Sequence, residues 1–222
     1  MKILDRSVFV GPSVHAHFPV IRLTFDLGKL EEWPSAKIGK QFTDSLVEAL
    51  PGLGSHGCSY REEGGFLRRL TEDDGTWLGH VFEHVVIELQ QIAGTDVTFG
   101  KTRGNGEYGQ YDVVFQYKQQ EVGLEAARVA LRLLHNLLPV ELAPEGSQDE
   151  EFNWEDERDS YIRFAQRRAL GPSTLALIAA AEERGIPWSR LNRYSLVQLG
   201  HGKYGKKIQA TITSETTHLG VE

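Results

Sequence analysis

The sequence has few sulfur-containing residues: one cysteine, Cys58, and one methionine among 222 residues. A single thiol cannot form an internal disulfide, and it excludes every metal site that needs several thiolates from this chain. This composition is typical of a protein in a reducing compartment, and we expect a cytoplasmic location.

The sequence also lacks long apolar runs and a basic charge balance. No stretch approaches the roughly 18 apolar residues of a membrane-spanning helix, and the first ten residues lack the apolar core of a secretory signal peptide. The chain has 24 Lys and Arg residues against 31 Asp and Glu residues, which gives a net charge of −7. General nucleic-acid binding depends on basic groups that neutralise phosphates. We therefore expect neither a membrane nor a nucleic acid as a partner.

The hydrophobic periodicity predicts an α+β domain over residues 1–140, with helices packed on a two-layer antiparallel sheet. The predicted strands are 2–10, 18–27, 96–99 and 110–117. The predicted helices are 35–50, a short turn at 66–70, 76–93 and 120–138. Asp74 or Thr76 is expected to cap the third helix, and Gly94 to end it.

The composition changes after Pro139. Residues 141–159 hold nine acidic residues and one basic residue, which predicts an acidic linker and helix over 141–169. Residues 170–222 are predicted to form a small αββ segment: a helix, then two or three strands at about 194–199, 206–213 and 217–221. Because the sequence stops inside the last of these strands, we expect a fragment or a naturally shortened relative of a longer protein.

The strongest chemical signal is H-x-x-E-H, formed by His80, Glu83 and His84 on the predicted helix 76–93. Residues four apart share one face of a helix, so the two imidazoles can bind one metal ion. Glu83 lies at the edge of this face, where it can act as a general base toward a water molecule beside the metal. This spacing is the inverted zinc-peptidase signature, and we expect zinc as the cofactor.

A catalytic zinc usually has a third protein ligand, which the sequence does not define. Glu88 continues the i, i+4 row from His84 and is our first choice, although it could instead orient a ligand by a hydrogen bond. Inverted zincins take their third ligand from a downstream element, so four other carboxylates are rivals: Glu107, Asp112, Glu121 and Glu125. Cys58 is expected to be structural, because the sequence gives it no electropositive setting.

Two basic segments are further candidates for binding. Lys101 and Arg103 lie in a glycine-bounded loop soon after the motif helix, where they could bind a substrate carboxylate or simply be surface charges. Residues 200–207 nearly match the phosphate loop G-x-x-x-x-G-K-[ST], but Lys207 replaces the hydroxyl residue and a strand pattern follows. We therefore expect a glycine-rich hairpin here, and no ATP bound by this chain alone.

Longer segments carry a family resemblance over essentially the whole chain. They are Gly65–Leu67, Gly79–His84, Glu88–Gln90, Phe99–Arg103, Leu170–Thr174, Gly185–Trp188, Gln198–Tyr204 and Lys207–Thr211. These segments resemble the N-terminal domain of cyanophycin synthetases and the start of the ATP-grasp domain that follows it. The resemblance implies that residues 170–222 are an incomplete ATP-grasp-like lobe, without ligase activity of its own.

The resemblance also implies a substrate. Cyanophycin has an aspartate backbone with arginine on the side-chain carboxylates, and the whole synthetase extends it with ATP. In that family the N-terminal domain helps to hold the polymer, and in some members it resembles a metallopeptidase that clips polymer into primers. His80, Glu83 and His84 match the positions of that hydrolytic motif.

Three interpretations of the chain remain open. The first is a zinc-dependent hydrolase acting on a cyanophycin-type polymer. The second is a non-catalytic module that binds polymer or docks on a ligase, with self-association as a further expectation. The third is a purely structural zinc, whose removal would unfold the domain. The intact H-x-x-E-H favours the first, because binding alone does not need Glu83 beside the two histidines.

Overall fold

The computed structural model describes residues 1–213, 215 and 216. Contacts between Cα atoms divide the chain into two compact units, Met1–Ala165 and Gln166–Glu222. Both units combine helices with an antiparallel sheet, which confirms the expected α+β class.

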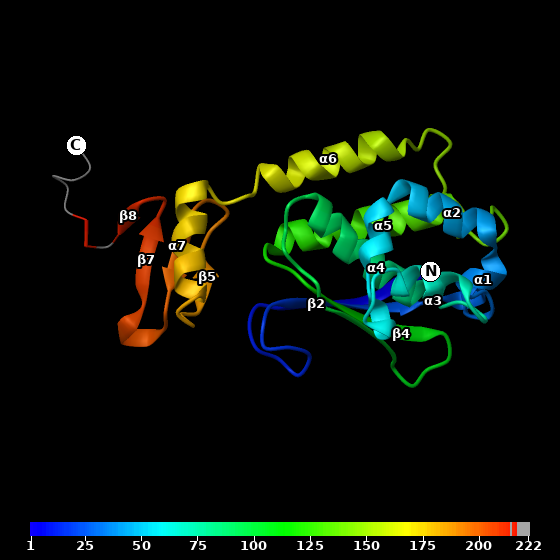
Figure 1. The fold of residues 1–222 in the computed structure, drawn as a ribbon, viewed down its shortest axis with the longest axis horizontal. Coiled ribbons are helices and arrows are strands. Elements are labelled where there is room, and N and C mark those ends of the chain that lie inside the picture. Colours follow the sequence, from blue (N-terminus) through cyan, green and yellow to red (C-terminus); the bar gives the residue numbers. More distant parts are fainter. Residues whose placement is uncertain (214, 217–222) are drawn as a thin grey trace. The chain divides into compact units, whose positions relative to one another are not determined.

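The first unit is built on a four-stranded antiparallel sheet (Figure 1). Its strands are β1 (Lys2–Phe9), β2 (Val20–Asp26), β3 (Gly100–Gly104) and β4 (Gln110–Gln116), in the order β1-β2-β4-β3. Alternate residues of β2 enter the core because successive side chains of a strand point to opposite faces. Ile21, Leu23 and Phe25 are accordingly almost fully buried.

Helices α4 (Leu78–Ile92) and α5 (Gln120–Leu137) pack against this sheet and against each other. Phe82 of α4 joins the layers, since its ring centroid lies 4.7 Å from Phe25 of β2 and 6.4 Å from Phe115 of β4. The shorter elements of this unit are η1 (Gly28–Glu32), α1 (Ser35–Ile38), α2 (Lys40–Ala49), η2 (Pro51–Ser55), η3 (Cys58–Tyr60) and α3 (Gly65–Thr71). The two-layer arrangement matches the expectation for residues 1–140.

Three local expectations were wrong. The predicted strand 96–99 has no regular structure, and the edge strand is instead β3, whose sequence GKTRG looks like a loop. The predicted helix 35–50 is interrupted at Gly39, whose φ of +114° is outside the helical region. The first helical turn of α4 follows Trp77, which makes no side-chain capping bond. The side chain of Thr76, which was the expected cap, forms a hydrogen bond with the imidazole of His80 instead.

The acidic segment after residue 140 packs onto the first unit. It contains α6 (Trp154–Gln166), which lies within the segment 141–169 predicted as an acidic linker and helix. Tyr161 is 1% exposed within the main core, and the indole of Trp154 donates a hydrogen bond to the carbonyl of Ala49. Glu157 accepts hydrogen bonds from Arg128 and Arg132 of α5. Apolar burial and these ion pairs together hold α6 in place.

The second unit has its own small sheet. Helix α7 (Pro172–Glu182) precedes β5 (Trp188–Arg190), β6 (Leu196–Leu199), η4 (Gly202–Tyr204), β7 (Lys206–Gln209) and β8 (Ile212–Thr213), and the strands are antiparallel in chain order. Its core is Leu170, Ile178, Val197 and Ile208. The hairpin β6–β7 confirms the expected hairpin at residues 200–207, and β5 was not foreseen. The predicted strand 217–221 lies outside the described residues.

The helices include no candidate for a membrane-spanning segment among the described residues. In the part of the chain that the structure describes, each of them is too short or too polar to cross a bilayer.

The half-buried His135 on α5 generates a prediction about pH. Burial lowers its pKa from 6.5 to about 4, while its Nε2 lies 3.2 Å from the carbonyl oxygen of Met1. Unfolding restores the ordinary pKa, so the unfolded chain binds a proton that the folded protein does not. Stability contributed by neutral His135 is therefore present above pH 6.5 and is lost as the pH falls toward 4.

We expect His135→Gln to reduce this loss. Between about pH 7.5 and about pH 5, the free energy of unfolding should fall by about 1 kcal/mol less in the variant, after discounting for solvent screening. Urea unfolding at both pH values measures the difference. His17→Gln, at an exposed histidine of the same unit, is the control. An equal pH dependence in wild type and His135→Gln would contradict the assignment.

Candidate metal centre

Helix α4 carries polar side chains into the core. Glu83, His84 and Glu88 are only 7%, 6% and 4% exposed, although the helix is otherwise mainly apolar. Buried polar groups destabilise a protein unless they find hydrogen-bond partners. Glu83 bonds the hydroxyl of Thr102 on β3, and His84 and Glu88 share one partner, His56, from the segment before α3.

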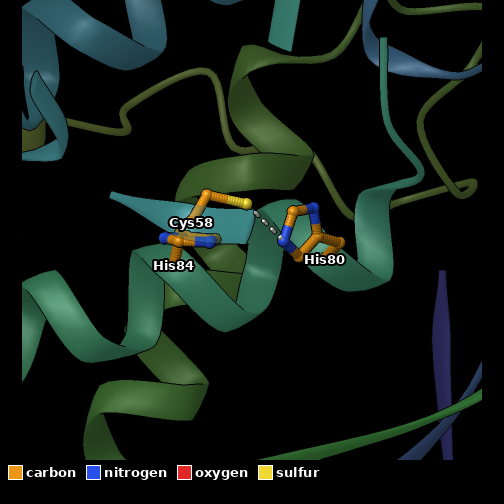
Figure 2. A group of neighbouring side chains, drawn as sticks. All are labelled: Cys58, His80 and His84. Atoms are coloured by element: carbon orange, nitrogen blue, oxygen red, sulfur yellow. Dashed lines mark hydrogen bonds between the residues drawn. The ribbon is translucent and has the colours of Figure 1, made fainter. Parts of the chain in front are cut away.

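His80, His84 and Cys58 form a compact group of side chains that could hold a metal ion (Figure 2). Their potential ligand atoms all lie within 4.8 Å of one another. The Cys58 sulfur is 3.4 Å from Nε2 of His80, and the two imidazole centroids are 4.8 Å apart. The sequence therefore placed the two histidines correctly on one face of a helix, and the fold adds a thiol from η3.

The surroundings fix how both imidazoles are presented. Nδ1 of His80 is 2.9 Å from the hydroxyl of Thr76, which leaves Nε2 toward Cys58. The ring of His84 stacks on Phe66, with centroids 3.9 Å apart and planes inclined by 19°. Its Nδ1 is engaged by His56 at 2.9 Å. Both rings therefore have one nitrogen occupied and one left for a ligand.

Electrostatics keep both imidazoles neutral, the form that binds metals. Burial, and secondarily the charge of Arg69, lowers the pKa of His80 to about 4. Burial, with smaller contributions from His80 and His56, lowers the pKa of His84 to about 2. Neither ring needs to release a proton near neutral pH before it binds a cation.

Glu83 is held by strand β3, outside this group. Its Oε2 accepts a hydrogen bond of 2.6 Å from the hydroxyl of Thr102. Burial raises the pKa of Glu83 to about 7, and the Thr102 bond and the charge of Arg103 limit the rise. A carboxyl group that titrates near neutrality suits a general acid–base role.

Glu88 does not belong to the compact group. Its Oε2 is 3.0 Å from Nε2 of His56, and His56 separates it from His84. Among the residues that the structure describes, the rival carboxylates also stay outside the compact group. Asp112 accepts a hydrogen bond from the hydroxyl of Thr24, and Glu125 forms an ion pair with Arg128. The identity of the third ligand remains a prediction, for which Cys58 is now the best-placed residue.

Sequence reasoning missed Cys58 and His56 as parts of this site. Both come from the glycine-rich segment 51–65, which has no periodic pattern to place its side chains. The signal that could have found them is the H-x-C sequence of residues 56–58, a pair of metal-binding residue types in a chain with one cysteine.

A cavity of about 970 Å³ is lined by Cys58, His80 and His84. Glu83 lines it together with four basic residues: Arg61, Arg69, Lys101 and Arg103. In the described part of the chain, none of these four forms an ion pair. The fold therefore brings both predicted basic residues to the site and adds two more from the segment before α4. The wall is cationic although the chain as a whole is acidic.

Comparison with known proteins identifies the family of the chain. Residues 22–139 match the family model described as "Cyanophycin synthase-like N-terminal domain". This chain belongs to that family. The match contains α4, β3 and β4, and therefore the H-x-x-E-H helix and the strand that holds Glu83.

Curated relatives extend the similarity to the whole chain. It is 41% identical over 225 residues to cyanophycin synthetases of Trichormus variabilis and of a Nostoc species, and 40% identical over 224 residues to that of Geminocystis herdmanii. These alignments cover 100% of the chain but only 24% to 25% of each relative. The chain thus spans about a quarter of the length of these synthetases.

The contact between β3 and Glu83 generates a prediction. A Cβ at Gly100 would lie 2.5 Å from Cγ and 2.6 Å from Oε1 of Glu83. We expect Gly100→Ala to displace the carboxylate and to lower the free energy of unfolding by about 1–3 kcal/mol. Gly104→Ala is the matched control, because the nearest atom to its Cβ is 4.0 Å away. Equal unfolding midpoints for the two variants would contradict the packing described here.

Proposed function

We propose that this domain is a zinc-dependent hydrolase that binds and cleaves amide bonds of a cyanophycin-type polymer. The observation that carries the proposal is the arrangement of Cys58, His80 and His84 at a cavity, with Glu83 held apart from them on Thr102. Relatives of the chain are named cyanophycin synthetases, which supplies the polymer as substrate. The proposal concerns this domain alone and includes no ATP-dependent step.

The donor set fits zinc. One sulfur and two imidazole nitrogens, all within 4.8 Å, match the ligand types and the three-ligand count of catalytic zinc sites. Cys58, His80 and His84 would hold the ion. Glu88 would act on the site indirectly, through its hydrogen bond with His56. When bound, zinc supplies a Lewis acid that polarises a carbonyl group and makes a nearby water molecule more acidic.

Glu83 provides the proton transfers. As a carboxylate it accepts a proton from the attacking water while the water oxygen bonds to the amide carbon. The protonated Glu83 then donates to the nitrogen as the carbon–nitrogen bond breaks. Its pKa of about 7 allows both directions of transfer near neutral pH. Thr102 fixes the carboxylate between these steps by its hydrogen bond.

The cationic wall binds the acidic groups of the substrate. Arginine residues attached to the polymer carry carboxylates, and guanidinium groups bind carboxylates strongly. Arg69 and Arg103 lie close enough to the site to shift the pKa values of His80 and Glu83. The same wall would serve a domain that holds polymer without cleaving it, which is the alternative function.

The first test is digestion of purified cyanophycin by the protein, with new chain ends counted by mass spectrometry. We expect cleavage that a chelator stops and zinc restores. Glu83→Gln should lower the rate by roughly 10²–10⁴-fold, with little change in bound zinc or in polymer binding. Retained polymer binding without cleavage in the zinc-loaded wild type would instead establish the non-catalytic alternative.

A second test addresses the cationic wall. Lys101→Gln and Arg103→Gln each remove one charge, and we expect each to raise KM several-fold, by roughly 1 kcal/mol of binding free energy per charge. The effect should shrink at high salt, because exposed charges are screened. Arg6→Gln, at an exposed position of β1 outside the cavity lining, is the control. Unchanged KM values at low salt would contradict this role for the wall.

A further inference from the structure

One buried histidine contacts the centre without belonging to the group of ligand atoms. The side chain of His56 is 8% exposed, and it lies between His84 and Glu88. Its Nδ1 is 2.9 Å from Nδ1 of His84, and its Nε2 is 3.0 Å from Oε2 of Glu88. A residue this buried, with both ring nitrogens engaged, has a defined proton arrangement.

With Glu88 as a carboxylate and His56 as a neutral imidazole, the two contacts of His56 fix the position of each proton. A carboxylate has no proton to donate, so Glu88 accepts from an Nε2–H of His56. A neutral imidazole has one N–H, which leaves Nδ1 of His56 as an acceptor. The short contact between the two Nδ1 atoms then needs a proton on His84. With its proton on Nδ1, His84 has an unprotonated Nε2, which is the nitrogen that a metal ion requires.

We propose that Glu88 and His56 form a hydrogen-bond relay that holds His84 in its metal-binding tautomer. Both are positioning residues, because they act on the metal only through His84. The inference rests on the proposed metal centre, but not on hydrolysis. It replaces direct ligation by Glu88 with a role two hydrogen bonds away from the metal.

The packing around Glu88 is consistent with a dedicated slot. A Cβ at Gly52 would lie 1.9 Å from Oε1 of Glu88, so only glycine leaves room for this carboxylate. Gly52 is the second residue of η2, the turn that leads directly into His56. The same short segment therefore makes space for one relay residue and supplies the other. Phe66 stacks on the ring of His84 and restricts its rotation.

Histidine tautomers can be observed directly by NMR of the ¹⁵N-histidine-labelled full chain without metal. We expect His56 to carry its proton on Nε2 and His84 to carry its proton on Nδ1. In Glu88→Gln the side chain can either donate or accept, so His56 should become a mixture of tautomers. A wild-type His84 protonated on Nε2, or a doubly protonated His56, would overturn the relay.

Metal affinity provides the second readout. We expect Glu88→Gln and His56→Phe to weaken Co²⁺ and Zn²⁺ binding about 10–100-fold, followed through the cobalt–thiolate absorption and by competition with a chelator. Glu157→Gln is the control, because it alters another largely buried carboxylate that lies on α6. Unchanged affinity in folded Glu88→Gln would overturn the relay.

A third variant guards against misfolding of the first two. Gly52→Ala should displace the Glu88 carboxylate and so weaken metal binding. In the double variant Gly52→Ala/Glu88→Ala the clash is removed, so the thermal stability of the domain should be restored. The metal affinity should stay low, because the relay is still broken. The outcomes separate the two proposals. Metal binding with the expected tautomers but no cleavage would overturn only the hydrolase. Absence of metal binding in the wild type would overturn both.

Discussion

The structure depends on satisfying polar groups that one helix carries into the core. Helix α4 is buried on nearly every side, yet it contains Glu83, His84 and Glu88. Such a helix can pack only where each of these side chains meets a partner, because an unpaired buried carboxylate would be strongly destabilising. Strand β3 supplies Thr102 to Glu83, and the segment after α2 supplies His56 to the other two. The hydrogen bonds that allow α4 to pack in the core therefore also position the residues of the candidate site.

Separation of roles follows from this packing. The proposed ligand His80 contacts Cys58 of η3, whereas the proposed base Glu83 bonds Thr102 of β3, so different elements position the two functions. Gly100 and Gly52 each leave out a Cβ that would collide with a carboxylate. The absence of a side chain at Gly100 lets Glu83 approach β3, and its absence at Gly52 lets Glu88 approach η2.

The sequence predicts the periodic parts of the molecule and the part of the site that lies on them. Strands β1, β2 and β4, helices α4 and α5, and the shared face of His80 and His84 follow from regular spacing. Cys58, His56 and β3 do not, because their positions depend on contacts between distant segments. Residues 100–104 contain two glycines and no apolar residue, and they become a strand only because β4 offers an unpaired edge. Glu88 shows the limit of spacing, since it lies in the right row but engages His56 rather than the group of ligand atoms.

The central claim is that one thiolate and two imidazoles form the metal site. X-ray absorption at the zinc edge of the zinc-loaded protein tests it most directly, because the spectrum distinguishes sulfur from nitrogen and oxygen ligands. The account predicts one sulfur and two imidazole nitrogens per zinc, with loss of the sulfur signal in Cys58→Ser. A wild-type spectrum with only nitrogen and oxygen ligands would contradict it and would return the third position to a carboxylate.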